Sequence, residues 1–154
     1  MPVVFARVEE RLIHGQIAYA WAQAIEFDVI VVVDEVSAKD PIIKSMLEMA
    51  CPRSKKLLVY SEAEACEKLN SINRKLFVIA KSPITFWHLL SNGVKIEKLN
   101  IGSIHFKSGK KEIYKTVFVS DDEIEALHNI IDSGITCEVQ KLPTESKKDV
   151  KDLI

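Results

Sequence analysis

The stretch Val29-Ile30-Val31-Val32-Val33 is an aliphatic run with no polar residue inside it. Successive side chains of a strand point to opposite faces, so a strand with one face in water alternates apolar and polar residues. An unbroken aliphatic run instead indicates a strand that is covered on both faces, as in a parallel sheet between two layers of helices. We therefore predict a central strand of an α/β fold at 29–33.

Comparable apolar segments alternate with amphipathic stretches along the rest of the chain. We predict strands at 3–8, 29–34, 56–60, 76–80, 98–101, 116–119 and 136–140. Strands that alternate with helices are typical of βαβ units stacked around a largely parallel sheet. The sequence thus predicts a single domain, residues 1–154, with a doubly wound α/β fold. We expect a mostly parallel central sheet of about six or seven strands, with helices on both faces.

The predicted helices repeat apolar residues at intervals of three and four, as helices with one buried face do. Several of them also have a recognisable start signal. Ser61 precedes Glu64 by the spacing of a capping box, and Ser120 precedes Glu123 in the same way. The pair Ser82-Pro83 opens a further helix.

The first predicted helix begins differently, because His14-Gly15-Gln16 offers no Ser, Thr, Asp or Asn at its start. Its free backbone N–H groups therefore need another partner. Free N–H groups and the positive end of the helix dipole, placed just after a strand, form a natural anion site. Gly15 leaves room for a phosphate to approach the backbone. We therefore expect an anion-binding turn at this helix start.

Composition and charge exclude several classes of function. Hydrophobic residues make up 47% and charged residues 28% of the chain, the balance of a folded globular protein. The formal net charge of −1 argues against nucleic-acid binding and against affinity for anionic membranes. The basic residues at 107–111 are typical of a solvated turn. The apolar run at 29–33 is far shorter than the roughly 20 residues of a spanning helix, and the N-terminus lacks the features of a secretory signal.

The sequence also lacks the motifs of common cofactor and metal sites. It contains neither a P-loop nor a G-x-G-x-x-G motif, so we expect neither ATP nor NAD. Cys51, Cys66 and Cys137 form no C-x-x-C pair, and no set of His, Cys and carboxylates has the spacing of metal ligands. We interpret the cysteines as reduced core thiols and expect neither a metal nor a cofactor.

The segment 7–16, RVEERLIHGQ, places an imidazole, two guanidinium groups and two carboxylates in or beside one turn. A neutral imidazole is a competent nucleophile near pH 7, which makes His14 a candidate phosphoryl acceptor. Arg11 is a candidate phosphate ligand, because its planar, permanently charged group fits phosphate oxygens. Glu9 or Glu10 is suited to accept a proton from the second ring nitrogen. The residues alone also fit an ordinary surface histidine among charges.

A resemblance to a known family favours the chemical interpretation. Segment 7–16 closely resembles the R-[IV]-D-x-R-L-I-H-G-Q signature of enzyme IIB components of sugar phosphotransferase systems of the mannose/fructose/sorbose type. Further segments are similar to that family along the whole chain: Asp34-Glu35-Val36 with Asp40-Pro41, Asn100-Ile101-Gly102, His105-Phe106, Gly109-Lys110 and Lys141-Leu142-Pro143-Thr144. The resemblance independently implies the doubly wound α/β fold.

The resemblance implies that His14 accepts a phosphoryl group on Nδ1 from a phosphohistidine of a IIA protein and donates it to a sugar. Arg11 matches the family's arginine three residues before the histidine. Glu9 stands where the family usually has an aspartate, so its carboxylate reaches one methylene further. The other family positions near the loop are occupied by Arg7, Gly15, Gln16 and Asp34, and the loop that carries His105 and Phe106 is a candidate contact for a partner or substrate.

The same resemblance implies the partners and the location. The phosphoryl donor is expected to be a IIA protein or domain, and the acceptor side is expected to consist of membrane-embedded IIC and IID components. The chain is expected to work in the cytoplasm, peripherally associated with the inner face of the cell membrane and without inserting into it. The segments Lys81-Ser82-Pro83 and Met46-Leu47-Glu48-Met49 resemble N-acetylgalactosamine-type members.

Two other classes of function remain open at this point. A regulatory module would accept phosphate on His14 without passing it to a sugar. A phosphohistidine-dependent hydrolase would need a second acid or base that directs a water molecule. His88 and His128 are interpreted as packed or surface residues of helices.

Overall fold

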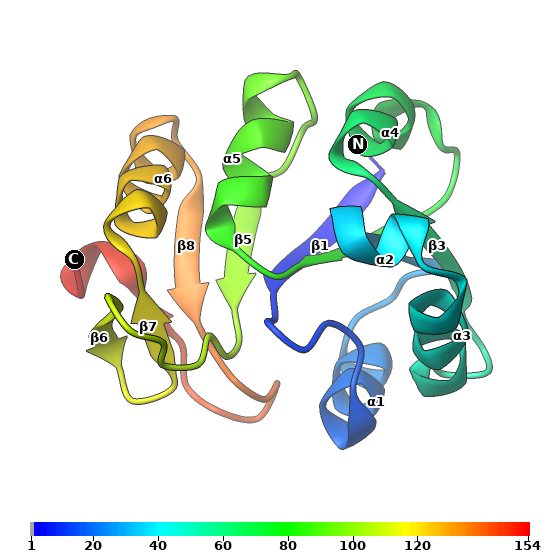
Figure 1. Cartoon of the computed structure of the whole chain (residues 1–154), viewed down its shortest axis with the longest axis horizontal. Helices are drawn as coiled ribbons and strands as arrows, with labels where there is room; N and C mark the ends of the chain where they lie inside the picture. The colour runs from blue at the N-terminus through cyan, green and yellow to red at the C-terminus, as the bar shows by residue number, and fades with distance from the viewer. Residues whose placement is uncertain (1) are drawn as a thin grey trace.

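The computed structural model describes residues 2–154, and within them the main sheet has seven strands in the order β3-β2-β4-β1-β5-β8-β9 (Figure 1). The strands are β1 (Val3–Val8), β2 (Val29–Val33), β3 (Lys56–Tyr60), β4 (Leu76–Ala80), β5 (Lys98–Ile101), β8 (Thr136–Val139) and β9 (Lys148–Asp149). Neighbouring strands pair in parallel except β8 and β9, which are antiparallel. The predicted doubly wound, mostly parallel sheet is therefore confirmed.

Helices cover both faces of this sheet. In Figure 1, α4 (Glu62–Lys68), α5 (Pro83–Ser91) and α6 (Asp121–Asp132) lie above the sheet, and α1 (Gly15–Ala24) and α3 (Pro41–Ala50) lie below it. Alternate residues of β2 serve the two layers, because Ile30 and Val32 share one buried cluster with Trp21 and Leu47, whereas Val31 belongs to the other cluster. The short helices are α2 (Glu35–Lys39), η1 (Leu69–Ser71) and η2 (Val150–Asp152).

Strand β2 is buried along its whole length, as its aliphatic sequence predicts. It lies between β3 and β4, and the middle position of the sheet belongs to β1. The chain runs outward from β1 to β2 and β3, returns to insert β4 beside β1, and then adds β5 and β8 on the far side. The direction of winding reverses at β1, and doubly wound folds bind ligands at the carboxyl ends of strands at such a reversal.

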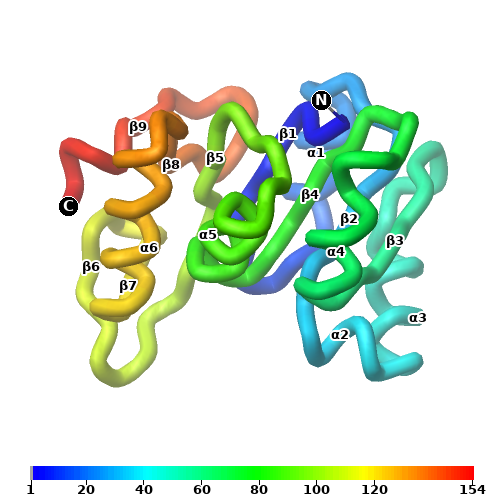
Figure 2. Tube along the Cα trace, turned by 90° about the horizontal axis from the view of Figure 1, so that it is seen from above, coloured from blue at the N-terminus to red at the C-terminus, as the bar shows by residue number. Residues whose placement is uncertain are grey.

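The segment predicted as a strand at 116–119 does form one, but outside the main sheet. β7 (Val117–Val119) pairs antiparallel with β6 (Lys111–Tyr114) in a separate two-stranded sheet. The two strands follow each other too closely for the long crossover that a parallel neighbour requires, so they form a hairpin instead. Figures 1 and 2 both place this hairpin beside α6, at the end of the molecule opposite β3.

The helix starts agree with the sequence signals. Ser61 and Ser120 each form a complete capping box, and the Ser82 hydroxyl accepts a hydrogen bond from a backbone N–H of α5. His14 occupies the cap position of α1, and its side chain makes no capping hydrogen bond to any described residue. Within residues 2–154, no helix has both the length and the apolar character that crossing a membrane requires.

The capping box of α6 gives a first test of this fold. Ser120→Ala removes the hydroxyl that accepts a hydrogen bond from the Glu123 N–H, 3.1 Å away. We expect the free energy of unfolding, measured by urea denaturation, to fall by about 1 kcal/mol. Ser45→Ala, at an exposed position inside α3, is the matched control and should change stability by less than roughly 0.5 kcal/mol. Equal losses in both variants would contradict the capping role.

Candidate functional site

The loop between β1 and α1 crosses the carboxyl end of the sheet. The Glu9 N–H donates to the Ala80 carbonyl at 2.8 Å, and the Glu10 N–H donates to the Ser103 carbonyl at 3.0 Å. These two bonds attach the loop to the end of β4 and to the segment that follows β5. Leu12 and Ile13 are buried in the cluster between the sheet and helices α1 and α3, and Leu12 adopts a positive φ of 57°. The loop is therefore anchored at several points, and His14 follows directly at the start of α1.

Arg7 lies at the end of β1 and is almost fully buried, with 1% of its surface exposed. Its guanidinium donates to the Asn100 side chain, to the Gln140 carbonyl at 2.8 Å and to the Lys141 carbonyl at 2.8 Å. It also stacks over the Trp21 ring, 4.7 Å from the ring centre. Burial lowers the pKa of Arg7, while the nearby Glu9 carboxylate opposes that effect. Arg7 thus joins β1 to β5 and to the segment after β8, away from the cleft beside His14.

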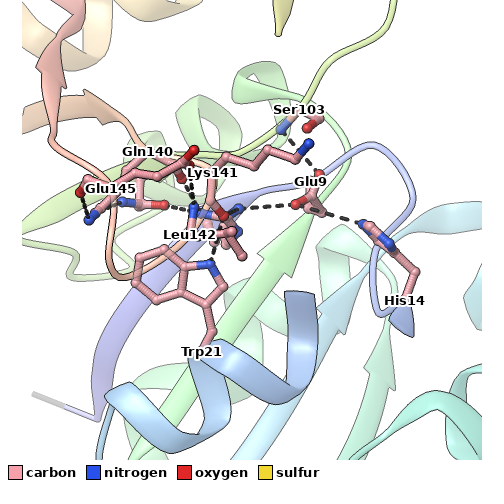
Figure 3. A network of polar contacts seen from close by, with 10 residues as sticks. Glu9, His14, Trp21, Ser103, Gln140, Lys141, Leu142 and Glu145 are labelled. Atoms are coloured by element: carbon pink, nitrogen blue, oxygen red, sulfur yellow. Dashed lines mark hydrogen bonds and ion pairs between the residues drawn. The ribbon is translucent and has the colours of Figure 1, made fainter. Parts of the chain in front are cut away.

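Glu9 links Arg7 to His14, and Figure 3 shows its carboxylate lying between Ser103 and the His14 ring. Glu9 Oε1 accepts a hydrogen bond from Arg7 Nη2 at 3.1 Å and lies 3.8 Å from His14 Nε2. Glu9 Oε2 accepts a hydrogen bond from the Ser103 N–H at 3.1 Å. The position after Ile101 must be glycine, because a Cβ on Gly102 would overlap the Arg7 and Glu9 side-chain atoms.

The His14 imidazole is partly buried, and its Nε2 atom faces Glu9. This nitrogen is shielded from solvent and has no hydrogen-bond partner within residues 2–154. Burial lowers the pKa of His14; the Glu9 charge opposes this effect, and the charges of Arg11 and Arg7 add to it. The neutral, nucleophilic imidazole therefore predominates at neutral pH. Folding opposes protonation of His14, so its contribution to stability decreases as the pH falls through about 6.5, the ordinary value.

A cleft of about 470 Å³ opens beside His14. Residues 10–15 of the loop form one side of its wall, and the other lining residues come from α2, α3 and the position after β4. Arg11 is exposed and makes no hydrogen bond or ion pair with the described part of the chain, so its guanidinium is free to bind an anion. Gly15 has a positive φ of 45°, and a Cβ there would meet no atom of the described residues within 4 Å. Gln16 is exposed at the start of α1.

Asp34 lies at the carboxyl end of β2, as predicted, but it serves mainly to cap α2. Its Oδ2 atom accepts hydrogen bonds from the Ser37 N–H at 3.1 Å and from the Ser37 hydroxyl at 2.6 Å. The same oxygen lies 3.7 Å from the Lys81 ammonium group. Ser37 and Lys81 both line the cleft beside His14. The sequence interpretation did not assign Lys81 to the site, although its position directly after β4 was a signal for it.

The two neighbouring carboxylates of the loop have different partners. Glu10 does not face His14; its Oε2 atom accepts hydrogen bonds from the His105 N–H at 2.7 Å and from His105 Nδ1 at 2.6 Å. Burial acts to raise the pKa of Glu10, but the hydrogen bonds and charges of His105 and Lys107 outweigh it, so the pKa is lowered. His105 is thereby held next to the loop, and Phe106 beside it is 64% exposed.

The electrostatic surroundings of His14 can be tested by substitution. Glu9→Gln keeps an oxygen for Arg7 but removes the negative charge that raises the pKa of His14, so this pKa should fall further. Arg11→Gln removes a positive charge that lowers it, so the pKa should rise. Titration of the imidazole signals by NMR measures both shifts. Shifts in the same direction would contradict the arrangement of Glu9 and Arg11 around His14.

Among residues 2–154, no three His, Cys, Asp or Glu side chains come together as a group that could hold a metal ion.

Comparison with known proteins identifies the family to which this chain belongs. The family described as "PTS system sorbose subfamily IIB component" matches residues 3–154. The N-acetylgalactosamine-specific phosphotransferase enzyme IIB component 2 of Escherichia coli K12 is 29% identical over 154 residues, covering 99% of this chain and 98% of that protein.

The mannose-specific EIIAB component of Escherichia coli K12 is 31% identical over 157 residues, covering 100% of this chain and 49% of the longer relative. The crystal structure of the IIBSor domain of the sorbose permease from Klebsiella pneumoniae superposes with a TM-score of 0.93 at 24% identity, covering 99% of this chain and 95% of that domain, which shows a shared fold. Because the family match runs through nearly the whole chain, the protein belongs to the sorbose subfamily of phosphotransferase-system IIB components and has a general role in phosphoryl transfer within a sugar phosphotransferase system.

Proposed function

We propose that His14 is the phosphoryl carrier of this protein. In this proposal His14 receives the phosphoryl group from a phosphohistidine of a IIA protein or domain and passes it to a sugar held by membrane IIC and IID components. The observation that carries the proposal is the position of the imidazole, which faces Glu9 at the start of a helix whose N–H groups lack a side-chain cap. Residues 1–154 act in this scheme as one IIB domain at the cytoplasmic face of the membrane.

The transfer is a displacement at phosphorus between two imidazoles. The lone pair of His14 Nδ1 forms a P–N bond while the P–N bond to the donor imidazole breaks and its electrons return to the donor nitrogen. The His14 ring gains positive character in this step, and the proton on Nε2 then makes a stronger contact with Glu9. The 3.8 Å separation of Glu9 Oε1 and His14 Nε2 is longer than a hydrogen bond, and such catalytic contacts commonly tighten in the reacting complex.

The phosphoryl oxygens have two sources of stabilisation at this position. The free N–H groups at the start of α1 point toward an anion placed beside His14, and the positive end of the helix dipole supports them. Arg11 adds a guanidinium that forms no hydrogen bond or ion pair with any described residue. Its two-pronged geometry matches two phosphoryl oxygens at once, which a compact ammonium group cannot do.

The surroundings of the cleft fit a protein partner. Helices α2 and α3, which contribute to the cleft wall, carry exposed apolar side chains at Val36, Ile42, Met46 and Met49, and Met46 itself lines the cleft. Methionine suits an interface that must accept more than one partner, because its side chain is flexible and polarizable. On the other side of the loop, Phe106 projects an exposed ring. We infer that the IIA donor and the membrane components approach His14 in turn over these surfaces, and that N-acetylgalactosamine or another amino sugar is the first acceptor to test.

Incubation with a phosphorylated IIA protein should label His14 and no other histidine, because among the histidines of residues 2–154 only His14 lies both in a cleft and at the start of a helix. Mass spectrometry locates the label, which should be labile in acid and stable in base, as a phosphoramidate is. Membranes that contain IIC and IID should then convert the labelled protein to sugar phosphate. Labelling that persists in His14→Ala would refute the assignment. Label that stays on the protein would favour a regulatory module, and release of free phosphate would favour a hydrolase.

Arg11→Gln should lower the rate of transfer far more than it lowers stability. Arg11 is exposed, so its truncation opens no core cavity and should cost about 1 kcal/mol or less. Loss of a charge-stabilising donor commonly slows a reaction by about a hundredfold, or roughly 2.7–4 kcal/mol of barrier. Lysine should restore the rate in part. Melting temperature and transfer rate are measured for wild type, Arg11→Gln and Arg11→Lys; equal rates in all three would exclude a role in handling phosphate.

A further inference from the structure

The charges around the His14 cleft are unequally available to an incoming phosphoryl group. Arg7 is buried and committed to Glu9 and to backbone carbonyls. Glu10 is occupied by His105 and by Lys107, whose ammonium lies 3.4 Å from Glu10 Oε1. Of the cations at 7–14, only Arg11 is therefore without a partner among the described residues and available to a phosphoryl group. A bound phosphoryl group carries a charge of about −1.5 to −2 at neutral pH, which one guanidinium balances only in part.

Lys81 is positioned to supply the missing charge. It directly follows β4, and β4 lies beside β1 with Ala80 opposite Val8, so Lys81 emerges next to the start of the His14 loop. It lines the same cleft as His14 and Arg11, but it belongs to the segment after β4 and not to the loop. The site therefore has a second cation that reaches the cleft from a separate strand.

The present partner of Lys81 holds it weakly. Its ammonium lies 3.7 Å from Asp34 Oδ2, and 46% of its side chain is exposed. Ion pairs with this much exposure are screened by water and contribute little to stability. Asp34 also keeps two hydrogen bonds from Ser37, so it is not left without partners when Lys81 moves. The flexible stem of a lysine lets its ammonium group turn from Asp34 toward the cleft.

We propose that Lys81 leaves Asp34 and binds the phosphoryl oxygens on His14, acting with Arg11 as the second cation of the site. This inference rests on the proposed role of His14. Lys81 neither gains nor loses a proton in the step; the P–N bond to the donor breaks, the P–N bond to His14 forms, and the ammonium group balances charge on the oxygens. Asp34 then serves to hold Lys81 beside the cleft while His14 is unphosphorylated.

The test compares Lys81→Met with Lys68→Met. Lys68 is a matched control, because its side chain is 49% exposed and its ammonium lies 3.8 Å from Glu64 within α4. With phosphorylated IIA as donor, we expect Lys81→Met to slow labelling of His14 at least tenfold, Lys68→Met to match wild type, and Lys81→Arg to recover most of the rate. All variants should melt at the wild-type temperature, since both lysines lie on the surface.

A second measurement separates contact from a purely structural role. A nearby cation favours the more highly charged form of the phosphoryl group and so lowers its second pKa. Phosphorus NMR of the labelled proteins should therefore show this pKa raised in Lys81→Met and unchanged in Lys68→Met. A slower Lys81→Met with an unchanged phosphorus titration would overturn the proposed contact, and so would a wild-type rate. Absence of label on His14 in the wild type would instead refute the proposed function itself.

Discussion

The buried guanidinium of Arg7 is the interaction on which the arrangement of the site depends. A charge removed from water must be compensated by hydrogen bonds and an opposite charge, or the fold loses several kcal/mol. Arg7 obtains its compensation from three separate parts of the chain: Asn100 on β5, the carbonyls of Gln140 and Lys141 after β8, and the carboxylate of Glu9. The carboxyl ends of β1, β5 and β8 are thereby held together, and Glu9 is held toward His14.

This constraint explains why two adjacent glutamates perform different tasks. Consecutive side chains leave the backbone on opposite sides, so Glu9 turns inward to Arg7 while Glu10 turns outward to His105. The Glu9 carboxylate still has an oxygen near His14, although the side chain is one methylene longer than an aspartate. Because Gly102 has no side chain, the Arg7 and Glu9 side chains fit against its backbone. Two adjacent residues therefore hold two different segments: Glu9 lies against His14, and Glu10 holds the segment that carries His105.

Much of the fold follows from local sequence, whereas parts of the site do not. The aliphatic run at β2 and the serine caps of α4 and α6 are local signals, and each one appears in the structure as predicted. The pairing of β7 with β6, and not with the main sheet, depends on the short turn between them. The sequence predicted the strand at 116–119 but not its partner β6, so the hairpin was not predicted. Lys81 escaped attention for a related reason. Its approach to the cleft depends on β4 inserting beside β1, which sequence order does not show.

Trp21 gives this architecture an optical property. Its indole N–H donates to the Lys141 carbonyl at 3.1 Å, one face of the ring meets the Arg7 guanidinium, and Phe5 stacks at 4.9 Å. The ring is thus shielded from water and surrounded by groups that quench or shift indole emission. Trp21 belongs to α1, the helix that follows His14, and its indole N–H contacts the segment after β8. Once Trp87, the second tryptophan of the sequence, is replaced by phenylalanine, the fluorescence of Trp21 offers an intrinsic, label-free reporter of movements between the helix start and the segment after β8.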